Sequence, residues 1–290
     1  SVSFSVSGEG NELTDTGTDI TVNLYKVADV DVSGNYTATG AFTGLDVSSV
    51  RADNNDAASE WADRAKEAQK MLKESVEPTA TVTLAKGIGS KDGLATGLYL
   101  VDTPEVVTTN YTYTFTPYLV SLPTNNYYSN GNDTWIYDLT DTNAIGLKPE
   151  EHARYGDLKI NKTLANHNAT TGKKATFVFK IEITPLKGKT ETRIESLDFE
   201  AAGDSSVTIT KIPAGAAVTV TEVYSGASYK LTSANDQTTK IIATDEKGAP
   251  VSVSFTNDID DNMNGGYGVK NNFKLDENDQ YQYTKPAAKN

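Results

Sequence analysis

Short stretches of alternating side chains dominate this sequence and limit its fold more than any other feature. Val, Thr, Tyr and Phe recur at every second position, and turns carrying Gly, Asn, Asp or Pro separate the stretches. This pattern is typical of antiparallel sandwiches, in which each strand buries one face. We therefore predict an all-β protein with strands at Val2–Val6, Ile20–Val27, Thr79–Leu84, Leu98–Asp102, Tyr111–Leu122, Leu158–Leu164, Thr176–Ile183, Ser206–Ile212, Ala217–Tyr224 and Val251–Asn257.

The length of the chain indicates two domains. A chain of 290 residues is long for one β-domain and sufficient for two, each with its own core. The polar stretch at 147–157 (LKPEEHARYGD) contains both a Pro and a Gly before a new strand pattern begins. We predict two tandem β-sandwich domains, at 1–152 and 153–275, followed by a polar linker at 276–290.

One segment, at about 55–76, departs from the alternation and predicts a helix. Its apolar residues recur at spacings of three and four, so one helical face is apolar. They are Ala58, Trp61, Ala65, Ala68 and Leu72. An acidic residue lies near the start of the segment and a Pro follows its end. We expect a single α-helix, inserted in the first domain and packed across its sheet.

Composition and charge exclude several classes of function. The 39 acidic residues outnumber the 26 Lys and Arg residues, and the net charge of −13 disfavours nucleic acid and anionic membranes as partners. Cysteine is absent, so there is no thiol nucleophile, disulfide or Cys-based metal site. No apolar run is long enough for membrane insertion, and neither His has the framework of a hydrolase triad. Motifs for phosphate or zinc binding are also absent, so we predict no cofactor.

A weaker metal signal lies after the last strand pattern. Asp260, Asn262, Asn264 and Gly265 match the opening of a calcium-binding loop. The twelfth position is Asn271 instead of the bidentate Glu that such loops need. We therefore interpret this segment as a turn and predict no metal site.

In each of three predicted strands in the second half, a polar residue follows apolar residues on the same face of the strand. Successive strand residues point to opposite faces, so Lys162 shares a face with Leu158 and Ile160. By the same rule Glu222 shares a face with Val218 and Val220, and Asn257 shares one with Val251, Val253 and Phe255. Lys159 falls on the opposite face. We expect Lys162, Glu222 and Asn257 to face the core.

Two arrangements would make such a buried cluster tolerable, since desolvation disfavours a lone buried charge. In one, Lys162 and Glu222 form a buried ion pair and Asn257 hydrogen-bonds to it. In the other, desolvation lowers the pKa of Lys162, and its neutral amine attacks the Asn257 carboxamide while Glu222 transfers protons. That reaction expels ammonia and leaves a Lys–Asn amide. Alternation alone does not choose between them.

The order of these pieces resembles the Cna B-type domains of Gram-positive surface proteins and pilins. The motifs are LKINKTL, which contains Lys162, VTVTEV, which contains Glu222, and VSFTN, which ends at Asn257, and the resemblance covers about residues 156–260. In that family the matching Lys and Asn form an intramolecular isopeptide bond, with the matching Glu as catalyst. The resemblance implies an Ig-like sandwich with a Lys162–Asn257 cross-link and Glu222 as its catalytic residue. Each chain would react once, so we do not predict an enzyme.

The N-terminal half contains the motifs TVNLYKVADV, GLYLVDTP, FTPYLVSLP and WIYDL, with the predicted helix between the first two. In this order they resemble the first domain of sortase-assembled pilins. In those pilins a sortase joins a proline-adjacent lysine, in a motif that opens with Trp, to the C-terminal threonine of the next subunit. Trp135 opens the motif here, and Lys148 in GLKPE is the candidate lysine for intersubunit linkage. It precedes its proline and lies farther from the Trp than is usual in the family.

The first domain departs from the cross-linked pattern. No lysine precedes Lys26, and Asp102 occupies the place where a catalytic Glu would be expected. A pairing of Lys26 with Asn143 is a weaker candidate for a cross-link. We expect this domain to be held by its core and its helix.

Together the resemblances imply a structural subunit, of the shaft type, in a pilus on the cell wall of a Gram-positive bacterium. The implied partners are other copies of the chain, a pilin-specific sortase, minor pilins and host ligands. The chain begins at Ser1 without an apolar secretion segment, so secretion is itself inferred. A minor or basal pilin, or the stalk of a wall-anchored adhesin, is one alternative. A carbohydrate-binding module using exposed aromatics of Tyr111–Tyr137 is another.

Overall fold

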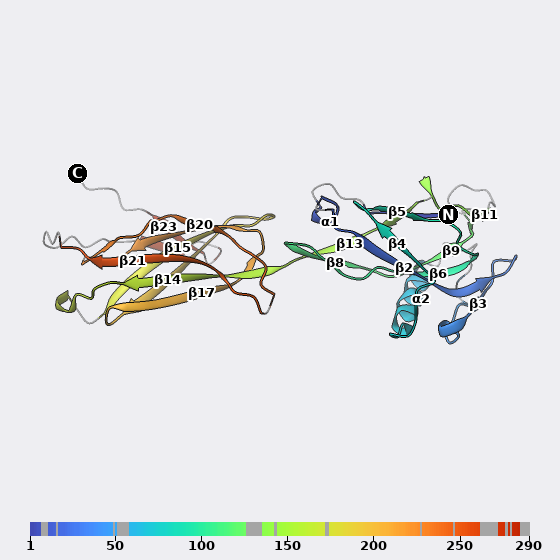
Figure 1. Cartoon of the computed structure of the whole chain (residues 1–290), viewed down its shortest axis with the longest axis horizontal. Helices are drawn as coiled ribbons and strands as arrows, with labels where there is room; N and C mark the ends of the chain where they lie inside the picture. The colour runs from blue at the N-terminus through green and yellow to red at the C-terminus, as the bar shows by residue number, and fades with distance from the viewer. Residues whose placement is uncertain are drawn as a thin grey trace. The chain divides into compact units, whose positions relative to one another are not determined.

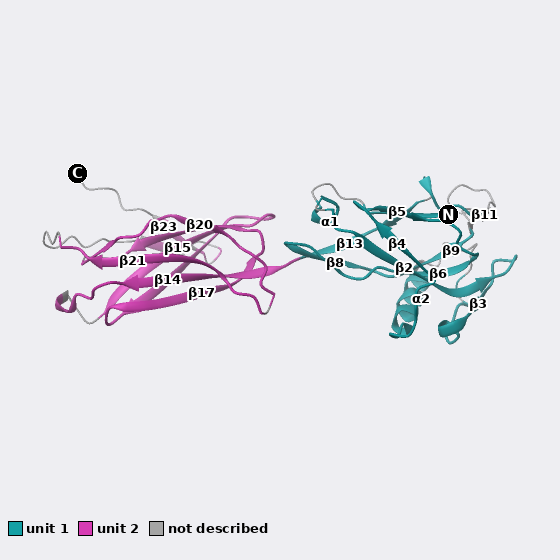
Figure 2. Ribbon diagram, in the orientation of Figure 1, with its two compact units in different colours: residues 1–152 teal, residues 153–290 magenta. Residues whose placement is uncertain are grey.

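A computed structural model divides the chain into two compact units, Ser1–His152 and Ala153–Asn290. Figure 1 labels the elements and Figure 2 colours the two units separately. Each unit is built mainly from strands and encloses its own apolar core, so the chain is all-β. The described residues are 1–6, 11–15, 17–48, 50, 58–125, 135–141, 144–171, 174–226, 228–245, 247–261, 272–275, 278 and 280–284.

The first unit contains two main sheets and a helix. One sheet has the strand order β3-β2-β6-β9 with β4 also paired to β2, and the other has the order β12-β1-β5. Strands β13-β8-β7 form a further three-stranded sheet, and β10-β11 form a two-stranded one. The elements are β1 (Val2–Val6), α1 (Glu12–Asp15), β2 (Ile20–Val30), β3 (Tyr36–Ala38), the 3₁₀ helix η1 (Gly40–Phe42), α2 (Ala58–Met71), β4 (Ala80–Leu84), β5 (Ile88–Lys91), β6 (Gly97–Asp102), β7 (Val106–Val107), β8 (Tyr111–Phe115), β9 (Tyr118–Leu122), β10 (Thr124–Asn125), β11 (Trp135–Ile136), β12 (Ile145–Leu147) and β13 (Pro149–Ala153).

The central strand β6 is buried on both faces. Gly97–Val101 are all buried, whereas an antiparallel strand with one solvent-exposed face would alternate between buried and exposed residues. Tyr99 and Val101 contribute to the core shared with β1, while Leu98 and Leu100 contribute to the core shared with α2. The β2–β6 sheet is therefore covered by strands on one side and by the helix on the other.

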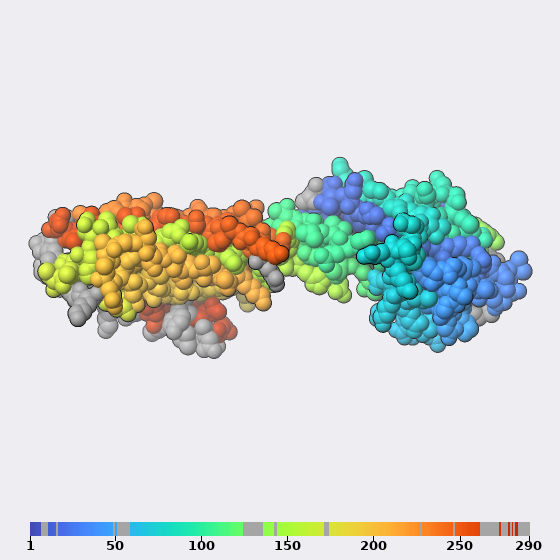
Figure 3. Space-filling model, turned by 60° about the horizontal axis from the view of Figure 1, so that its bottom comes forward, coloured from blue at the N-terminus to red at the C-terminus, as the bar shows by residue number. Residues whose placement is uncertain are grey.

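Helix α2 packs across this sheet, as its apolar face predicted. Ala65 and Ala68 are fully buried, and Trp61 and Met71 contact the same core as Leu98. In Figure 3 the blue and cyan atoms of the N-terminal part of the chain, which include η1 and α2, form one continuous surface on this unit. The helix ends at Met71, earlier than the predicted end at 76, and its predicted start at 55 lies outside the described residues.

The second unit is a sandwich of two four-stranded sheets, with orders β17-β14-β21-β19 and β16-β15-β18-β20. In the first sheet β14 and β21 are paired in parallel, although they come from opposite ends of the sandwich sequence. The elements are β14 (Tyr155–Leu164), the 3₁₀ helix η3 (Ala169–Thr171), β15 (Ala175–Thr184), β16 (Glu191–Phe199), β17 (Gly203–Pro213), β18 (Ala217–Tyr224), β19 (Tyr229–Leu231), β20 (Gln237–Lys240), β21 (Val251–Ile259), β22 (Asn272–Leu275) and β23 (Tyr281–Thr284).

Alternation fixes the core of the second unit, and the predicted pattern is confirmed. Every second residue of β14 is buried from Gly156 to Leu164, and every second residue of β15 is buried from Ala175 to Ile183. The buried rows of both sheets meet in one apolar cluster. The site described below lies within these rows.

Two segments predicted to be polar connections contain strands instead. The stretch 147–157 includes β13, which pairs with β8, and the start of β14. Because four of the five β13 residues are exposed, its sequence carries no alternating signal. The predicted linker at 276–290 contains β23, which pairs with β22 in an antiparallel hairpin. Helix α1 was also not predicted, since its four residues are too few for a helical period to show.

Candidate functional site

Three strands of the second unit bring Lys162, Glu222 and Asn257 together. Lys162 lies on β14 and Asn257 on the adjacent parallel strand β21, with Leu164 in register with Asn257. Glu222 lies on β18 in the facing sheet. Each of the three follows apolar residues on the buried face of its strand, where the sequence placed it. The cluster therefore spans the sandwich from sheet to sheet.

The carboxylate of Glu222 lies between the other two groups. Its Oε2 accepts a hydrogen bond from Lys162 Nζ at 2.5 Å, and its Oε1 accepts one from Asn257 Nδ2 at 2.6 Å. Lys162 Nζ is also in close contact with Asn257 Oδ1. The exposed fractions of the three residues are 1%, 8% and 0% in chain order. The amine and the carboxamide are thus in direct contact and shielded from water.

Two aromatic rings from β15 complete the surroundings of the amine. Lys162 Nζ lies 4.2 Å from the ring centroid of Phe177 and 5.8 Å from that of Phe179. Sequence reasoning did not include these residues in the site. Their alternation in ATFVFKIEIT marks a buried row, which was the available signal. The rings replace water around the amine with apolar surface.

Burial and pairing act in opposite directions on the amine. Desolvation lowers the pKa of Lys162 from the usual lysine value, and this is the largest effect. The hydrogen bond and charge of Glu222 raise it, but by less. A lysine held in this way gives up its proton more readily than one in water, so a neutral nucleophilic amine is accessible. The arrangement can therefore support attack on the neighbouring carboxamide.

Lys148, the candidate for intersubunit linkage, lies on the surface of the first unit. It occupies the single position between β12 and β13, and its side chain is exposed while the preceding Leu147 is buried. An amine must be accessible to be used by an external transpeptidase, and this lysine meets that requirement. Lys159 points away from the sandwich core and lines an open hollow on the outer face of β14 with Thr163 and Asp204.

In the described part of the first unit, Lys26 and Asp102 contact residues other than each other. Lys26 forms an ion pair with Asp29, at 2.6 Å, on its own strand. Asp102 accepts a hydrogen bond from Gln69 of α2 at 2.8 Å, so it ties the helix to the sheet. Asn143, the weaker candidate partner of Lys26, lies outside the described residues. This unit is held by its two apolar cores.

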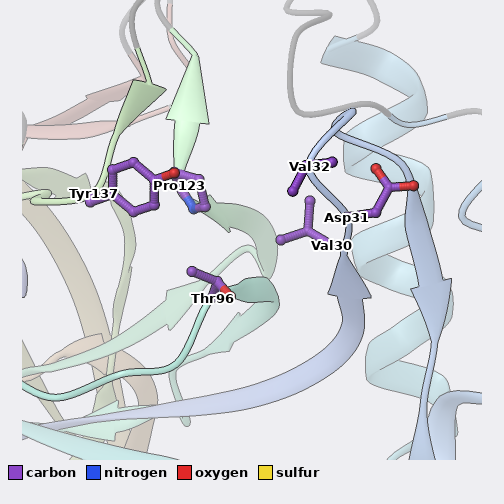
Figure 4. A pocket seen from close by; sticks show the side chains of 6 residues that line it. All are labelled: Val30, Asp31, Val32, Thr96, Pro123 and Tyr137. Carbon is purple, nitrogen blue, oxygen red and sulfur yellow. The ribbon is translucent and has the colours of Figure 1, made fainter.

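The aromatics of Tyr111–Tyr137 are mostly part of the fold where the structure describes them. Tyr113 is fully buried and donates a hydrogen bond to Glu151, and Tyr111 packs against the same core. Tyr137 is exposed and lines a surface hollow of about 210 Å³. Figure 4 shows Tyr137 beside Pro123, with Val30, Asp31 and Val32 across the hollow and Thr96 below. Among the described side chains of this stretch, Tyr137 is the one exposed aromatic, whereas Tyr127 and Tyr128 lie outside the described residues.

The described part of the chain contains no cluster of three or more His, Asp or Glu residues that could hold a metal ion. Residues 262–271, which include most of the calcium-loop match, lie outside that part. Among the described helices, none is long and apolar enough to cross a membrane.

Comparison with known proteins places the site within a recognised domain. Residues 158–260 match a family described as a domain of unknown function (DUF5979), and this segment contains Lys162, Glu222 and Asn257. The match covers only part of the chain. No curated protein matches the sequence.

Among solved structures, the chain is similar to pilins and adhesins of Gram-positive bacteria. It shares 12% identity with the minor pilin GBS52 of Streptococcus agalactiae, over 92% of this chain and 100% of that one, with a TM-score of 0.27. It shares 12% identity with the major pilin SpaA of Corynebacterium diphtheriae, over 89% and 100%, with a TM-score of 0.26. An adhesin of Mobiluncus mulieris is 15% identical over 83% and 84%, with a TM-score of 0.29. At these TM-scores the likeness alone establishes no function.

Proposed function

We propose that this chain is a structural subunit of a sortase-assembled pilus, whose second unit is locked by a self-formed amide bond between Lys162 and Asn257. One observation carries the cross-link. Glu222 presents one carboxyl oxygen to the amine and the other to the carboxamide nitrogen, at 2.5 and 2.6 Å. An ion pair alone would need only the first of these contacts, and the amine also lies in close contact with the carboxamide that it would attack.

The geometry supports a proton-balanced reaction. The lone pair of Lys162 Nζ attacks Cγ of Asn257, and the bond from Cγ to Nδ2 breaks. Before the attack, the Lys162 ammonium gives one proton to Glu222, which leaves a neutral amine and a carboxylic acid. Glu222 then delivers its proton to Nδ2 and takes one from the attacking amine, so Asn257 Nδ2 leaves as ammonia. The product is a neutral secondary amide, and Glu222 is a carboxylic acid both before and after the attack. One turnover per chain makes this a maturation step, not an enzymatic activity toward other substrates.

The polymer context rests on the N-terminal motifs and on Lys148. The strand and helix motifs of the first unit resemble those of sortase-assembled pilins, and Lys148 is exposed. In this proposal a pilin-specific sortase joins Lys148 to the C-terminal threonine of the next subunit, outside the cell on the cell wall. A shaft subunit needs such an amine, whereas the stalk of an unpolymerised adhesin does not.

Replacement of Lys148 tests this role directly. Expressed in the source organism from its own gene, the wild-type chain should give a ladder of high-mass, denaturant-resistant species, and Lys148→Arg should abolish it. Lys159→Arg is the matched control, because that side chain lies on the outer face of the second unit, and its ladder should be unchanged. An undiminished ladder from Lys148→Arg would refute the assignment of this lysine, and a wild-type chain without any ladder would refute polymerisation.

A further inference from the structure

The segment between β19 and β20 crosses from one sheet of the sandwich to the other. Strand β19 pairs with β21, which carries Asn257, and β20 pairs with β18, which carries Glu222. The crossover at 232–236 therefore connects the two sheets that supply the site. Its side chains bond to the backbone of both strands close to the site residues.

At one end of the crossover, Asn235 acts as a substitute strand partner for Glu222. Its Oδ1 accepts a hydrogen bond from the Glu222 N–H at 2.9 Å, and its Nδ2 donates one to the Glu222 carbonyl at 3.2 Å. The ladder between β18 and β20 stops at Val220, so no β20 residue pairs with Glu222 on that side. The Asn235 amide thus makes the two bonds that a neighbouring strand would have made.

The backbone at Glu222 has particular need of this support. The pairing of β18 with β15 changes register between Glu222 and Tyr224, which leaves Val223 as the extra residue of a bulge. A bulge bends its strand and changes the direction of nearby side chains. The adjoining Asp236 accepts a hydrogen bond from the Thr221 hydroxyl at 2.6 Å, which fixes the crossover against β18 one residue before Glu222.

At its other end the crossover holds the residue before Asn257. The backbone N–H of Thr232 donates to the Thr256 carbonyl at 2.8 Å. The hydroxyl of Ser233 accepts a hydrogen bond from the Thr256 N–H at 3.0 Å. One short segment therefore fixes the backbone on both sides of the reacting pair, across the two sheets.

We infer that Asn235 is a positioning residue for the cross-linking reaction. It holds the Glu222 backbone so that the two carboxyl oxygens reach Lys162 Nζ and Asn257 Nδ2 together. The inference rests on the proposed Lys162–Asn257 bond and adds a residue that does not touch the reacting atoms. Displacement of a catalytic group by about 1 Å can cost on the order of 100-fold in rate, so loss of this support slows the reaction.

The test follows the mass of the full chain over time after cell-free synthesis. The wild-type chain should lose the mass of one ammonia, and Asn235→Ala should do so on the order of 10-fold to 100-fold more slowly. Gln237→Ala is the matched control. The Gln237 amide bonds to the backbone N–H and carbonyl of Ser254 in the same manner, so its loss removes equivalent bonds without touching Glu222. Asn235→Asp keeps the acceptor for the Glu222 N–H and should restore part of the rate.

Each outcome decides the inference. Three results together support positioning through the Glu222 N–H. Asn235→Ala should cross-link slowly, Gln237→Ala should have a rate near that of the wild type, and Asn235→Asp should recover part of the rate. Equal rates in Asn235→Ala and Gln237→Ala would overturn it, as would an Asn235→Asp chain that is folded and as slow as Asn235→Ala. A wild-type chain that never loses ammonia would refute the proposed cross-link itself, which is a separate failure.

Discussion

At the scale of single residues, Lys162 shows how burial and pairing combine. The amine is enclosed by Phe177 and Phe179, which favours its neutral form, and it contacts a carboxylate, which favours the charged form. Removal of one partner from such a buried pair typically costs about 3–5 kcal/mol. Conversion of the amine and carboxamide into an amide removes the buried ammonium altogether. The proposed product would therefore suit this core better than the reactants do.

Glu222→Gln should prevent the cross-link and lower the stability of the second unit. The loop closed by the bond spans 95 residues, and by analogy with a disulfide its closure stabilises by on the order of 4 kcal/mol. For a unit of this size that corresponds to a fall of about 15 °C in the unfolding midpoint, measured by calorimetry. Glu182→Gln, on the outer face of β15, is the control and should leave the midpoint nearly unchanged. Equal midpoints for the two variants would contradict the account.

The rate of cross-linking should fall at alkaline pH. The reactive form has a neutral Lys162 amine and a protonated Glu222 carboxyl, and it holds the same number of protons as the Lys162–Glu222 ion pair. Loss of the proton that the two groups share therefore removes the reactive form. Burial lowers the pKa of Lys162, so this proton is lost at a lower pH than from an ordinary lysine. Timed mass spectra of fresh chain across a pH series measure the rate. A rate that keeps rising through the usual lysine range would exclude Glu222 as the proton carrier.

At the scale of strands and helices, what the sequence predicts depends on how local the signal is. The faces of β14, β18 and β21 follow from a period of two, so Lys162, Glu222 and Asn257 could be placed in the core in advance. Strand β13 could not, because its exposed residues show no alternation and its pairing with β8 depends on the tertiary fold. The role of Asn235 could not be predicted either, because its contact with the Glu222 backbone depends on the path of the crossover between the two sheets.

The start of β14 should require glycine, with no side chain, at position 156. A methyl group there would overlap the carbonyl oxygen of Ile242 and crowd the side chain of Ile241, and backbone atoms cannot move aside cheaply. Gly156→Ala should destabilise the second unit by about 1–3 kcal/mol, measured by denaturant unfolding. Gly146→Ala in β12 has open space around the added methyl and should stay within about 0.5 kcal/mol of the wild type. An unchanged free energy of unfolding in Gly156→Ala would contradict this, because it would show that the segment repacks around the added methyl group.

At the scale of the whole molecule, the proposed bonds define a short covalent path for tension. A force applied at Lys148 enters the chain just before β13 and reaches Lys162 on β14. The amide then carries it to Asn257 on β21, so the intervening 95-residue span of the sandwich is bypassed. The first unit, up to Lys148, also lies outside this path along the chain. Apart from β13 and its pairing with β8, the first unit would then carry no load, and most of the second unit would not need to resist unfolding.

Single-molecule pulling tests this path. The chain contains no cysteine, so Lys148→Cys and Asn290→Cys provide unique attachment points. With the cross-link intact, the segment between Lys162 and Asn257 should not extend. The additional Glu222→Gln change should release roughly 330 Å of chain, at about 3.5 Å for each residue of the 95-residue span. The same extension from both chains would contradict a covalent bypass.

The most direct test of the central claim is the intact mass of the purified wild-type chain, followed by proteolytic digestion. We expect a mass lower than that of the sequence by one ammonia, together with a branched peptide in which Lys162 is joined to Asn257. An unmodified mass, with separate peptides for β14 and β21, would contradict it. In that case the Lys162–Glu222–Asn257 cluster would be a buried ion pair with a hydrogen-bonded amide, and the sandwich would have no covalent lock.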